Sequence, residues 1–580
     1  MTILEKLKQT TNLYDFAKFL GYKKGSLAYI LYSPKYMNKY VSFKIPKRSG
    51  GMRTINAPDK KLKKVQKILS EKLQNCYEEI QEKSEQPSIV KSIKNKIVHG
   101  YRINTSIETN AFCHRNKRFV LNLDLDNFFP SINFGRVYGF FIKDRNFCLA
   151  PSIATIIAQI SCYNNELPQG APTSPVIANF ITKILDIKLL KLAKKYNLTY
   201  TRYADDLTFS CNAKEFPTSI AFSVDNKWEI GSELLDAIRQ SGFSVNVNKT
   251  RMQYNNSRQE VTGLIVNKKV NIKREYYKKL RAQCYSLIKN GCFYDDKNKS
   301  DINALRNLEG RLNFAFYAKN FENKIHKKDA EQIETSKKDL NLITGKQKFF
   351  DNKREDVYAH VSLIENLMSI NKLYSMFLIY KHFILPKKNL ILCEGKTDNI
   401  YIKSAIDVLK NKLNFYHPIK FIPHSNMLDM LTEYIGGTSK LKKFCQNYKK
   451  IIDKFGITNL QFPLIVIVDN DKAGKEVFNI KTFENTVSVN VKFMHPNLYI
   501  VRLPNTSSDD FVIENYFDDD IKTFEGKIFN PTNQKCSKTE FGKSVFATKV
   551  ILKQKNNIDF SKFEPLLQEI DQIIKRHTTR

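Results

Sequence analysis

Three aspartates in the first half of the 580-residue chain have the residue type and spacing needed for metal chemistry on phosphates. Asp124 ends one alternating segment, and Asp205 and Asp206 lie side by side in another. Adjacent carboxylates repel each other unless cations neutralise them. Two divalent metals ~3.5–4 Å apart would do so while activating a hydroxyl and stabilising a phosphate leaving group. The three residues therefore predict a catalytic Mg²⁺ site. Taken alone, an Asp-Asp pair is also typical of an ordinary turn.

A second acidic set follows two apolar runs in the last third of the chain. Glu394 ends the run that begins at Asn389, and Asp469 and Asp471 end the run that begins at Pro463. If both runs are strands of a parallel sheet, their carboxyl ends meet at one edge. We expect the three acids to bind Mg²⁺ or Mn²⁺ there. The alternative is that Asp-Asn-Asp is only a polar exit from a strand.

The first acidic set needs a sheet to position it. The alternation over residues 119–124 predicts a strand whose polar face ends in a carboxylate. Residues 200–210 predict a hairpin with two acids at its tip, and residues 42–58 predict another hairpin. Residues 60–83 predict a Lys-rich amphipathic helix, and the leucine spacing in residues 1–35 is also helical.

The pattern changes twice further along the chain. Residues 268–320 predict basic helices, with four cations close together: Arg274, Lys278, Lys279 and Arg281. Residues 322–356 are dominated by charged and amide side chains, which indicates a connector or a solvated helix. After Pro386, short apolar strands alternate with helices, and this predicts a parallel α/β domain. We place the main boundary near residue 385.

The charge of the chain indicates a polyanionic partner. Lys and Arg total 94 against 58 Asp and Glu, a formal net charge of +36. A nucleic-acid partner explains this excess of positive charge, because phosphate contacts release counterions. The alternative explanation is a solubilising protein surface in a Lys- and Asn-rich organism. No apolar run approaches the ~20 residues of a membrane span. The N-terminus does not resemble a secretion signal, and ten cysteines lack any C-x-x-C pair. We expect a soluble, reduced, cytoplasmic protein without a membrane partner.

Five motifs around the first acidic set stand in the order found in reverse transcriptases. Tyr203-Ala-Asp-Asp206 resembles their catalytic box. Ile45–Arg53 resembles their fingers hairpin, and Leu123–Phe129 resembles their first acidic motif. Leu167–Pro175 resembles the template- and nucleotide-handling loop, and Ser241–Thr250 resembles the motif that follows the catalytic box. The resemblance implies an α+β right-hand polymerase (fingers, palm and thumb) that uses dNTPs and an RNA template. It also implies nucleotide contacts for Arg53, Phe129, Gln169 and Lys249. Among these, Phe129 would be the gate against a ribose 2′-hydroxyl.

Two further elements are similar to retron reverse transcriptases. Asn110-Ala-Phe-Cys-His114 matches their N-A-x-x-H pattern, and Val261-Thr262-Gly263 matches their V-T-G element. The resemblance implies that these residues take part in RNA recognition, although His114 as a single residue is more typical of a structural histidine. It further implies a cognate structured non-coding RNA, in which a guanosine 2′-hydroxyl primes synthesis of a branched RNA–DNA product. The basic helices after residue 268 would be the thumb that grips an A-form duplex.

The second acidic set resembles a different family. Residues 387–515 are similar to the TOPRIM fold of topoisomerases, primases and overcoming-lysogenisation-defect nucleases, an α/β fold with a mainly parallel sheet. In the nuclease branch a later acid and a lysine assist the metals, which implies Glu514 and Lys543 here. Each could equally be an ordinary surface charge. Thr397 is a candidate helix cap. No separate domain supplies an obvious tyrosine nucleophile, so hydrolysis of a nucleic-acid target is expected rather than strand passage.

Together the resemblances indicate a retron reverse transcriptase with a fused TOPRIM nuclease. The predicted domains are fingers and palm (1–267), thumb (268–325), connector (326–385) and TOPRIM-like domain (386–580). The implied function is antiphage defence, in which the branched DNA restrains the nuclease until infection, and a homo-oligomer is one possible state. Two alternatives stay open: a reverse transcriptase of another lineage, such as a group II intron maturase, and a non-catalytic RNA-binding scaffold.

Overall fold

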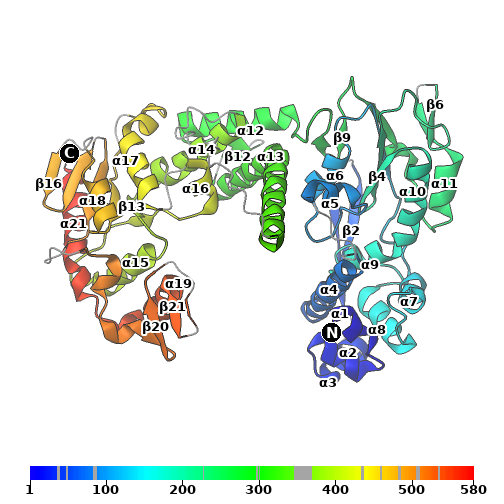
Figure 1. The fold of residues 1–580 in the computed structure, drawn as a ribbon, viewed down its shortest axis with the longest axis horizontal. Helices are drawn as coiled ribbons and strands as arrows, with labels where there is room; N and C mark the ends of the chain where they lie inside the picture. Colours follow the sequence, from blue (N-terminus) through cyan, green and yellow to red (C-terminus); the bar gives the residue numbers. More distant parts are fainter. Residues whose placement is uncertain are drawn as a thin grey trace. The chain divides into compact units, whose positions relative to one another are not determined.

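A computed structural model gives the arrangement of most of the chain. It describes these residues: 1–34, 39–47, 50–81, 88–225, 227–295, 298–299, 301–344, 369–432, 437–457, 460–480, 485–494, 496–504, 510–532, 536–537 and 539–579. The chain divides into two compact units (Figure 1). Unit 1 consists of Met1–Tyr276 and the described part of Tyr317–Phe350, and unit 2 of Tyr277–Phe316 and the described part of Asp351–Arg580. None of the described helices has the length and apolar character required to cross a membrane.

Unit 1 begins with helices and one hairpin, as the sequence predicts. Its first elements are α1 (Ile3–Lys8), α2 (Leu13–Leu20), α3 (Lys24–Tyr32), β1 (Tyr40–Pro46), β2 (Met52–Pro58) and α4 (Lys60–Gln81). The strands β1 and β2 pair in antiparallel fashion, with Tyr40 opposite Pro58. Helix α4 buries Leu62, Val65, Leu69 and Leu73, which recur at helical spacing. That stripe packs into the core of the unit.

The centre of unit 1 is an antiparallel sheet in the order β4-β5-β3-β8. Its strands are β3 (Phe119–Asp124), β4 (Thr199–Tyr203), β5 (Asp206–Cys211) and β8 (Arg251–Tyr254). The surrounding helices are α5 (Ile89–Asn95), α6 (Ile107–Cys113), α7 (Phe134–Lys143), α8 (Pro151–Ser161), α9 (Ser174–Ile181), α10 (Lys183–Lys195) and α11 (Ser232–Arg239). The predicted strand over 119–124 and the predicted hairpin over 200–210 are confirmed.

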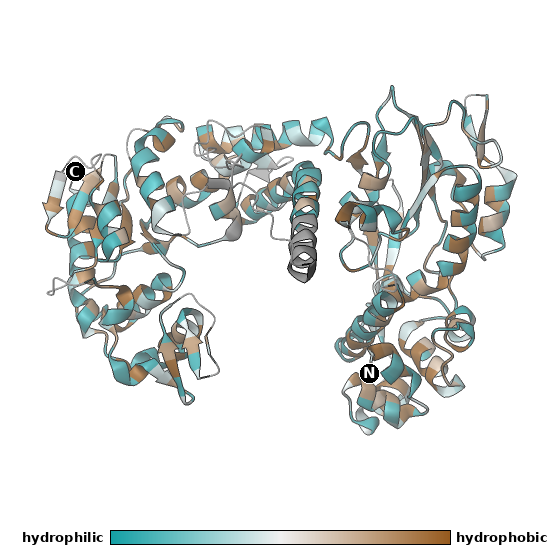
Figure 2. Cartoon of the chain, in the orientation of Figure 1, coloured by the Kyte–Doolittle hydropathy of each residue, from teal (hydrophilic) through white to brown (hydrophobic). Residues whose placement is uncertain are grey.

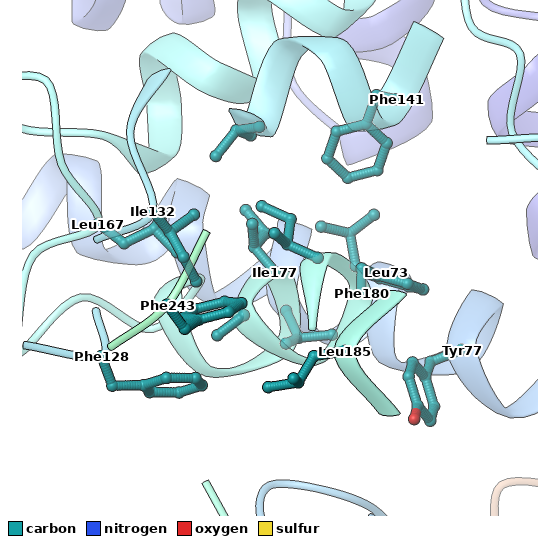
Figure 3. Packing of buried hydrophobic residues seen from close by; sticks show 14 of the residues in the cluster. Leu73, Tyr77, Phe128, Ile132, Phe141, Leu167, Ile177, Phe180, Leu185 and Phe243 are labelled. Carbon is teal, nitrogen blue, oxygen red and sulfur yellow. The ribbon is translucent and has the colours of Figure 1, made fainter. Parts of the chain in front are cut away.

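The core of unit 1 joins the sheet region to these helices. Figure 3 shows Phe128 beside Phe243, and the two rings are stacked with centroids 6.0 Å apart. On α9, Phe180 contacts the ring of Phe147 edge-on at 5.1 Å and that of Tyr77 of α4 at 5.3 Å. Aromatic side chains bury large apolar areas, so they anchor the helices around the central sheet.

The outer edge of β4 is covered by a segment from a distant part of the chain. Arg202 donates its backbone N–H to Ile97 at 2.8 Å, and His99 donates its own to Arg202 at 2.9 Å. Val98 thus forms a parallel bridge with Arg202. The segment 97–99 thereby fixes the strand that leads into the Asp205-Asp206 turn.

Two small hairpins and two long helices follow. The hairpins pair β6 (Ala221–Val224) with β7 (Lys227–Ile230), and β9 (Glu260–Val261) with β10 (Leu264–Ile265). The helices are α12 (Arg274–Asn290) and α13 (Ile302–Thr344). Helix α13 continues through the predicted thumb–connector boundary at residue 325, so no element ends there. Of the charged segment 322–356, residues 322–344 are helical and the remainder lies outside the described residues.

The predicted boundary near residue 385 differs from the division into units. Residues 369–384 form α14 (Ser369–Ile379) and a π-helical turn (Tyr380–Ile384). These pack on the first half of α13 within unit 2. Tyr374 contacts the ring of Phe316 at 6.1 Å, and Lys381 pairs with Glu309 at 2.6 Å. The predicted thumb helices therefore cluster with the C-terminal elements, through contacts that sequence periodicity does not reveal.

Unit 2 contains a six-stranded sheet in the order β14-β13-β15-β18-β17-β16. Its strands are β13 (Asn389–Cys393), β14 (Ile419–Phe421), β15 (Leu464–Val468), β16 (Asn485–Ser488), β17 (Val491–Met494) and β18 (Leu498–Arg502). The first four strands in this order are parallel, and β17 and β16 are antiparallel to their neighbours. Every residue of β13 and β15 is buried. Such continuous apolar strands are typical of parallel sheets covered on both faces.

Helices complete unit 2. They include α15 (Asp398–Leu409), α16 (Asn426–Thr432), α17 (Thr438–Asp453), α18 (Lys472–Phe478) and α21 (Glu564–Thr578). Helix α17 buries Leu441, Phe444, Cys445, Tyr448 and Ile451 along one stripe. Its remaining surface is largely hydrophilic, as Figure 2 shows. A small sheet, β19 (Thr523–Phe524), β20 (Lys527–Asn530) and β21 (Glu540–Gly542), leads to Lys543.

Candidate active site

The sheet register of unit 1 brings the three predicted aspartates together. Asp124, the last residue of β3, lies directly opposite Asp206, the first residue of β5. Asp205 precedes it in the two-residue turn between β4 and β5, and its carbonyl accepts the backbone N–H of Leu125 at 3.0 Å. Directly opposed residues on antiparallel strands have neighbouring side chains. Three carboxylates thus gather at one end of the sheet.

The electrostatics of these acids reflect their crowding. Burial raises the pKa of Asp205, and the negative charge of Asp124 adds to that effect. Burial, together with both neighbouring aspartates, raises the pKa of Asp206 to about 7. The Lys249 ammonium lies 2.9 Å from Asp124 Oδ2, and this bond raises the pKa of Lys249. The group therefore attracts cations strongly, since a positive charge relieves the repulsion.

The donor set suits a hard divalent cation. Carboxylate oxygens are the ligands that Mg²⁺ prefers. In the described part of the chain, no three His, Cys, Asp or Glu side chains already stand in an arrangement that encloses a metal. At this site the Lys249 ammonium lies against Asp124. We therefore argue the fit from ligand type and charge.

Two of the predicted nucleotide-contact residues, Arg53 and Lys249, lie near the same acids, and Gln169 lies on a loop bound to the β1–β2 hairpin. Arg53 is exposed on β2, and its charge lowers the pKa of Asp205 in opposition to burial. The carbonyl of Gln169 accepts the Asn56 N–H of the hairpin at 2.8 Å. Gly170 adopts φ 125°, and a Cβ there would lie 2.9 Å from the Asn56 carbonyl. The Leu167–Pro175 loop is therefore attached to the β1–β2 hairpin at a point that requires glycine.

Tyr101 is a residue at this site that sequence reasoning missed. It has φ 57°, its side chain is 46% exposed, and its ring lies 6.3 Å from that of Phe129. Partial burial raises the pKa of its phenol, and the nearby Asp205 charge adds to the shift. Tyr101 and Phe129 together form an aromatic border beside the acids. No motif quoted above includes Tyr101, although the adjacent Gly100 marks a close backbone approach.

Asn110 and His114, predicted to take part in RNA recognition, lie inside the protein. Both side chains are fully buried. The two His114 ring nitrogens lie 2.7 Å from the hydroxyls of Ser210 and Thr201, and Thr201 donates to Asn110 Oδ1 at 2.6 Å. These residues therefore tie α6 to strands β4 and β5, which carry the acidic turn. The burial and hydrogen bonds of His114 favour the structural alternative.

The V-T-G element also contacts this helix. Thr262 and Gly263 form the turn between β9 and β10, with φ 46° and 81°. Positive φ at both positions is the type I′ pattern. Val261 is buried, and the Thr262 hydroxyl donates to the Ile107 carbonyl at 3.1 Å. Gly263 is exposed, so of the three it is the one whose surface RNA could reach.

Buried histidines make the stability of unit 1 depend on pH. Burial lowers the pKa of His114 to about 3 and that of His99 to about 4. Above pH ~6.5 both are neutral in the folded and unfolded states; below it, the unfolded chain binds protons that the folded chain cannot. Each histidine should therefore cost about 1.4 kcal/mol of stability per pH unit between pH ~6 and its folded pKa.

Urea unfolding from pH 7.5 to 5, followed by fluorescence of the single tryptophan, Trp228, tests this expectation. Trp228 lies in unit 1, where its ring contacts Phe216 and Tyr254. His114→Gln should give a flatter pH profile than wild type, by about 1.4 kcal/mol per pH unit in the acid range. Identical slopes would contradict a neutral buried His114.

A second acidic cluster lies in unit 2, at the carboxyl ends of β13 and β15. Glu394 follows β13 and accepts a hydrogen bond from the Thr438 hydroxyl, while Asp469 follows β15 and accepts the Ile513 N–H at 3.1 Å. Asp471 accepts the Gly474 N–H at 2.7 Å as the cap of α18. The predicted meeting of Glu394, Asp469 and Asp471 at one sheet edge is consistent with their mutual charge effects.

The candidates Glu514 and Lys543 lie in this cluster and not on the open surface of the protein. Glu514 is 3% exposed, and Lys543 lies 3.0 Å from its Oε1. Burial, followed by the charges of Asp398, Glu394 and Glu514, raises the pKa of Asp469 to about 8. The alternative of an ordinary surface charge is therefore excluded for Glu514.

Asp398 is an acid of this cluster that the prediction missed. It is the first residue of α15, and its Oδ2 accepts the Gly395 N–H at 2.7 Å. Thr397 occupies the predicted N-cap position of α15, but its side chain makes no capping hydrogen bond. The spacing of Glu394 and Asp398 could have predicted that Asp398 lies in this cluster, because two residues four positions apart lie on either side of a single turn.

The second cluster also suits a divalent cation. In the described part of the chain, Glu394 Oε2 is buried without a hydrogen-bond partner, and neither Glu514 oxygen accepts one beyond the Lys543 ion pair. Buried charges left without partners are costly. A cation held by carboxylate oxygens would remove this cost, which fits Mg²⁺ or Mn²⁺.

Comparisons with known proteins match part of the chain. Residues 45–272 match the family model "Reverse transcriptase (RNA-dependent DNA polymerase)". The chain is 33% identical over 316 residues to retron Mx65 reverse transcriptase of Myxococcus xanthus, covering 51% of this chain and 66% of that protein. It is 32% identical over 277 residues to retron Ec86 reverse transcriptase of Escherichia coli, covering 48% of this chain and 78% of that protein. A solved telomerase from Candida albicans, in complex with a TWJ fragment of telomeric RNA, aligns with a TM-score of 0.31 and 10% identity over 59% of this chain and 64% of that one.

The sheet, the acidic turn and the family match define the class of unit 1 as a reverse transcriptase domain of mixed α/β structure. Within that class the alignment covers most of the Escherichia coli relative. The chain belongs to the retron reverse transcriptases.

Proposed function

We propose that the chain is an active RNA-directed DNA polymerase that copies a cognate structured RNA into branched, RNA-linked single-stranded DNA. The observation that carries the proposal is the register of the sheet, which places Asp124 opposite Asp206 and beside Asp205. The net charge of +36 supports a nucleic-acid partner. The expectation of an RNA-linked product rests on the retron relatives' family.

In this mechanism Asp124, Asp205 and Asp206 hold the divalent metals. When bound, the metals supply Lewis-acid stabilisation of the phosphates and activation of the attacking hydroxyl. Arg53 adds positive charge near Asp205 for the dNTP triphosphate, and Lys249 leaves Asp124 to face the same phosphates. Phe129 and Tyr101 border the space for the sugar, and Gln169 lies on a loop attached to the hairpin.

For unit 2 we propose a metal-dependent phosphodiesterase of the TOPRIM type. The support is the cluster of five acids and Lys543 at one edge of a mainly parallel sheet, with buried carboxylate oxygens that lack partners. Glu394, Asp398, Asp469, Asp471 and Glu514 would hold the metals. Lys543 would stabilise negative charge on the phosphate, and the substrate is a nucleic acid. The two activities together would serve antiphage defence, with the branched DNA restraining the nuclease.

Analysis of the nucleic acid that copurifies with the full chain from its native host tests the polymerase proposal. We expect single-stranded DNA joined to RNA through a 2′–5′ linkage. A debranching enzyme should release the two strands, and Asp205→Asn protein should carry only the RNA. Copurified RNA without DNA from the wild type, in cells that hold the full locus, would favour the scaffold alternative.

A further inference from the structure

The largest fully buried side chain in unit 1 lies three residues before a catalytic aspartate. Arg202, on β4, is 0% exposed. A guanidinium is always charged, and burying a charge is unfavourable unless it is paired and hydrogen-bonded. The hydrogen bonds of its three nitrogens offset this cost.

Arg202 divides its nitrogens between a carboxylate and the acidic turn. Its Nε and Nη2 donate to the two oxygens of Asp186, on α10, at 2.9 and 2.8 Å. The remaining nitrogen, Nη1, donates to Asn179 Oδ1 and to the backbone carbonyl of Ala204, both at 3.1 Å. Tyr200 donates its hydroxyl to Asp186 at 2.8 Å. The bidentate pair thus orients the third nitrogen toward the turn.

Ala204 has a conformation that its residue type disfavours. It is the first central residue of the two-residue β4–β5 turn and has φ 57°, whereas Asp205 is not among the residues with positive φ. This is the type II′ pattern, in which that position is usually glycine. A left-handed conformation is costly for an L-residue. Contacts outside the turn must therefore hold Ala204 in place.

The backbone of Gly100 also restricts Ala204. A Cβ on Gly100 would lie 2.5 Å from the Ala204 nitrogen, so the two backbones are already in close contact. Asn179 Nδ2 donates to the Gly100 carbonyl at 2.9 Å while its Oδ1 accepts from Arg202. Asn179 thus joins the two groups that enclose Ala204.

We propose that Arg202 is a positioning residue for DNA synthesis: its Nη1 holds the Ala204 carbonyl and thereby fixes the left-handed turn that directs Asp205. The role deepens the proposed polymerase function and rests on it. Arg202 is fully buried, beneath the surface that metals and nucleotide would reach. It acts through the backbone, so its loss lowers turnover rather than affinity for dNTP.

The test compares steady-state DNA synthesis by purified full-length variants on a primed RNA template. Lysine in Arg202→Lys keeps the positive charge but lacks the planar fork, so it cannot hold Asp186 bidentately and Ala204 together. We expect kcat to fall at least tenfold while KM for dNTP changes less than threefold. Circular dichroism and thermal unfolding verify that the variant is folded at the assay temperature.

Rescue distinguishes positioning from simple stabilisation. Ala204→Gly removes the penalty for positive φ, so the double variant with Arg202→Lys should regain roughly 5- to 30-fold in kcat, the factor that the left-handed penalty represents. The matched control is Arg102→Lys, which alters the bidentate pair with Glu78 (Nη2–Oε2 3.0 Å). It should retain kcat within twofold.

The outcomes separate the two proposals. If Asp205→Asn protein still makes DNA, the proposed polymerase site is wrong. If Asp205→Asn is inactive while folded Arg202→Lys keeps full kcat, or if Ala204→Gly gives no rescue, only the positioning role is overturned. Should Arg202→Lys fail to fold, Asn179→Ala replaces it, because it removes one of the two acceptors that orient Nη1 and leaves the Arg202–Asp186 pair intact; the same kcat loss and glycine rescue are then required.

Discussion

Replacing both Asp205 and Asp206 with Asn is expected to abolish DNA synthesis and to leave binding of the structured RNA largely intact. Amides are neutral and bind divalent metals weakly compared with carboxylates, so the metals would be lost. Charge stabilisation by such metals is worth several kcal/mol, which corresponds to a fall in rate of about 10³-fold or more. RNA affinity should change little, because these acids sit at the turn and contribute negative charge.

Extension of a labelled primer on RNA, with filter binding of the same RNA, measures both effects. Asp236→Asn on α11 is the matched control, since Asp236 is an exposed aspartate of the same unit. It should behave as wild type. Normal complementary DNA from the double variant would remove the basis for assigning the catalytic site.

Glu394→Ala is expected to leave branched-DNA synthesis nearly normal and to remove a divalent-metal-dependent nuclease activity. Glu394 belongs to the sheet of unit 2, whereas Asp124 and Asp205 belong to that of unit 1. Loss of one carboxylate leaves the metals under-coordinated, so hydrolysis should fall by about 10²-fold or more. If the proposed effector role holds, phage resistance in cells disappears together with the nuclease activity.

Wild type, Glu394→Ala and Glu476→Ala should be compared in polymerase, nuclease and infection assays. Glu476, on α18, is exposed and pairs with Lys442, so its loss removes an acid without affecting the cluster. Omission of Mg²⁺ and Mn²⁺ should reproduce the Glu394→Ala nuclease result in wild-type protein. Full phage resistance from Glu394→Ala would refute catalysis by unit 2 as the basis of defence.

Local pattern was enough to predict the catalytic strands. Alternation over 119–124 and around 205–206 is a period-two signal that depends on neighbouring residues only, and the structure has strands at these places. The buried runs before Glu394 and Asp469 are likewise recognisable, because parallel strands covered on both faces are continuously apolar. The acids at their ends follow from the strand boundaries.

Long-range packing was not predictable in the same way. Asn110 and His114 looked like recognition residues as a motif, yet their partners Thr201 and Ser210 are far away in the sequence. Tyr101 follows Gly100, whose backbone closely approaches that of Ala204, a residue more than 100 positions away in the sequence. The clustering of thumb helices with residues 369–384 depends on pairs such as Phe316 and Tyr374. Such contacts leave no periodic trace in a single sequence.

The parallel bridge between Val98 and Arg202 has a consequence for solubility. In the order β4-β5-β3-β8, strand β4 stands at the border of the sheet. An uncovered border strand offers free N–H and C=O groups that invite pairing with another copy of the chain, which is a route to aggregation. Residues 97–99 occupy these groups at Arg202. The segment that pairs with the strand before the Asp205-Asp206 turn thus also keeps these groups from pairing with another copy of the chain.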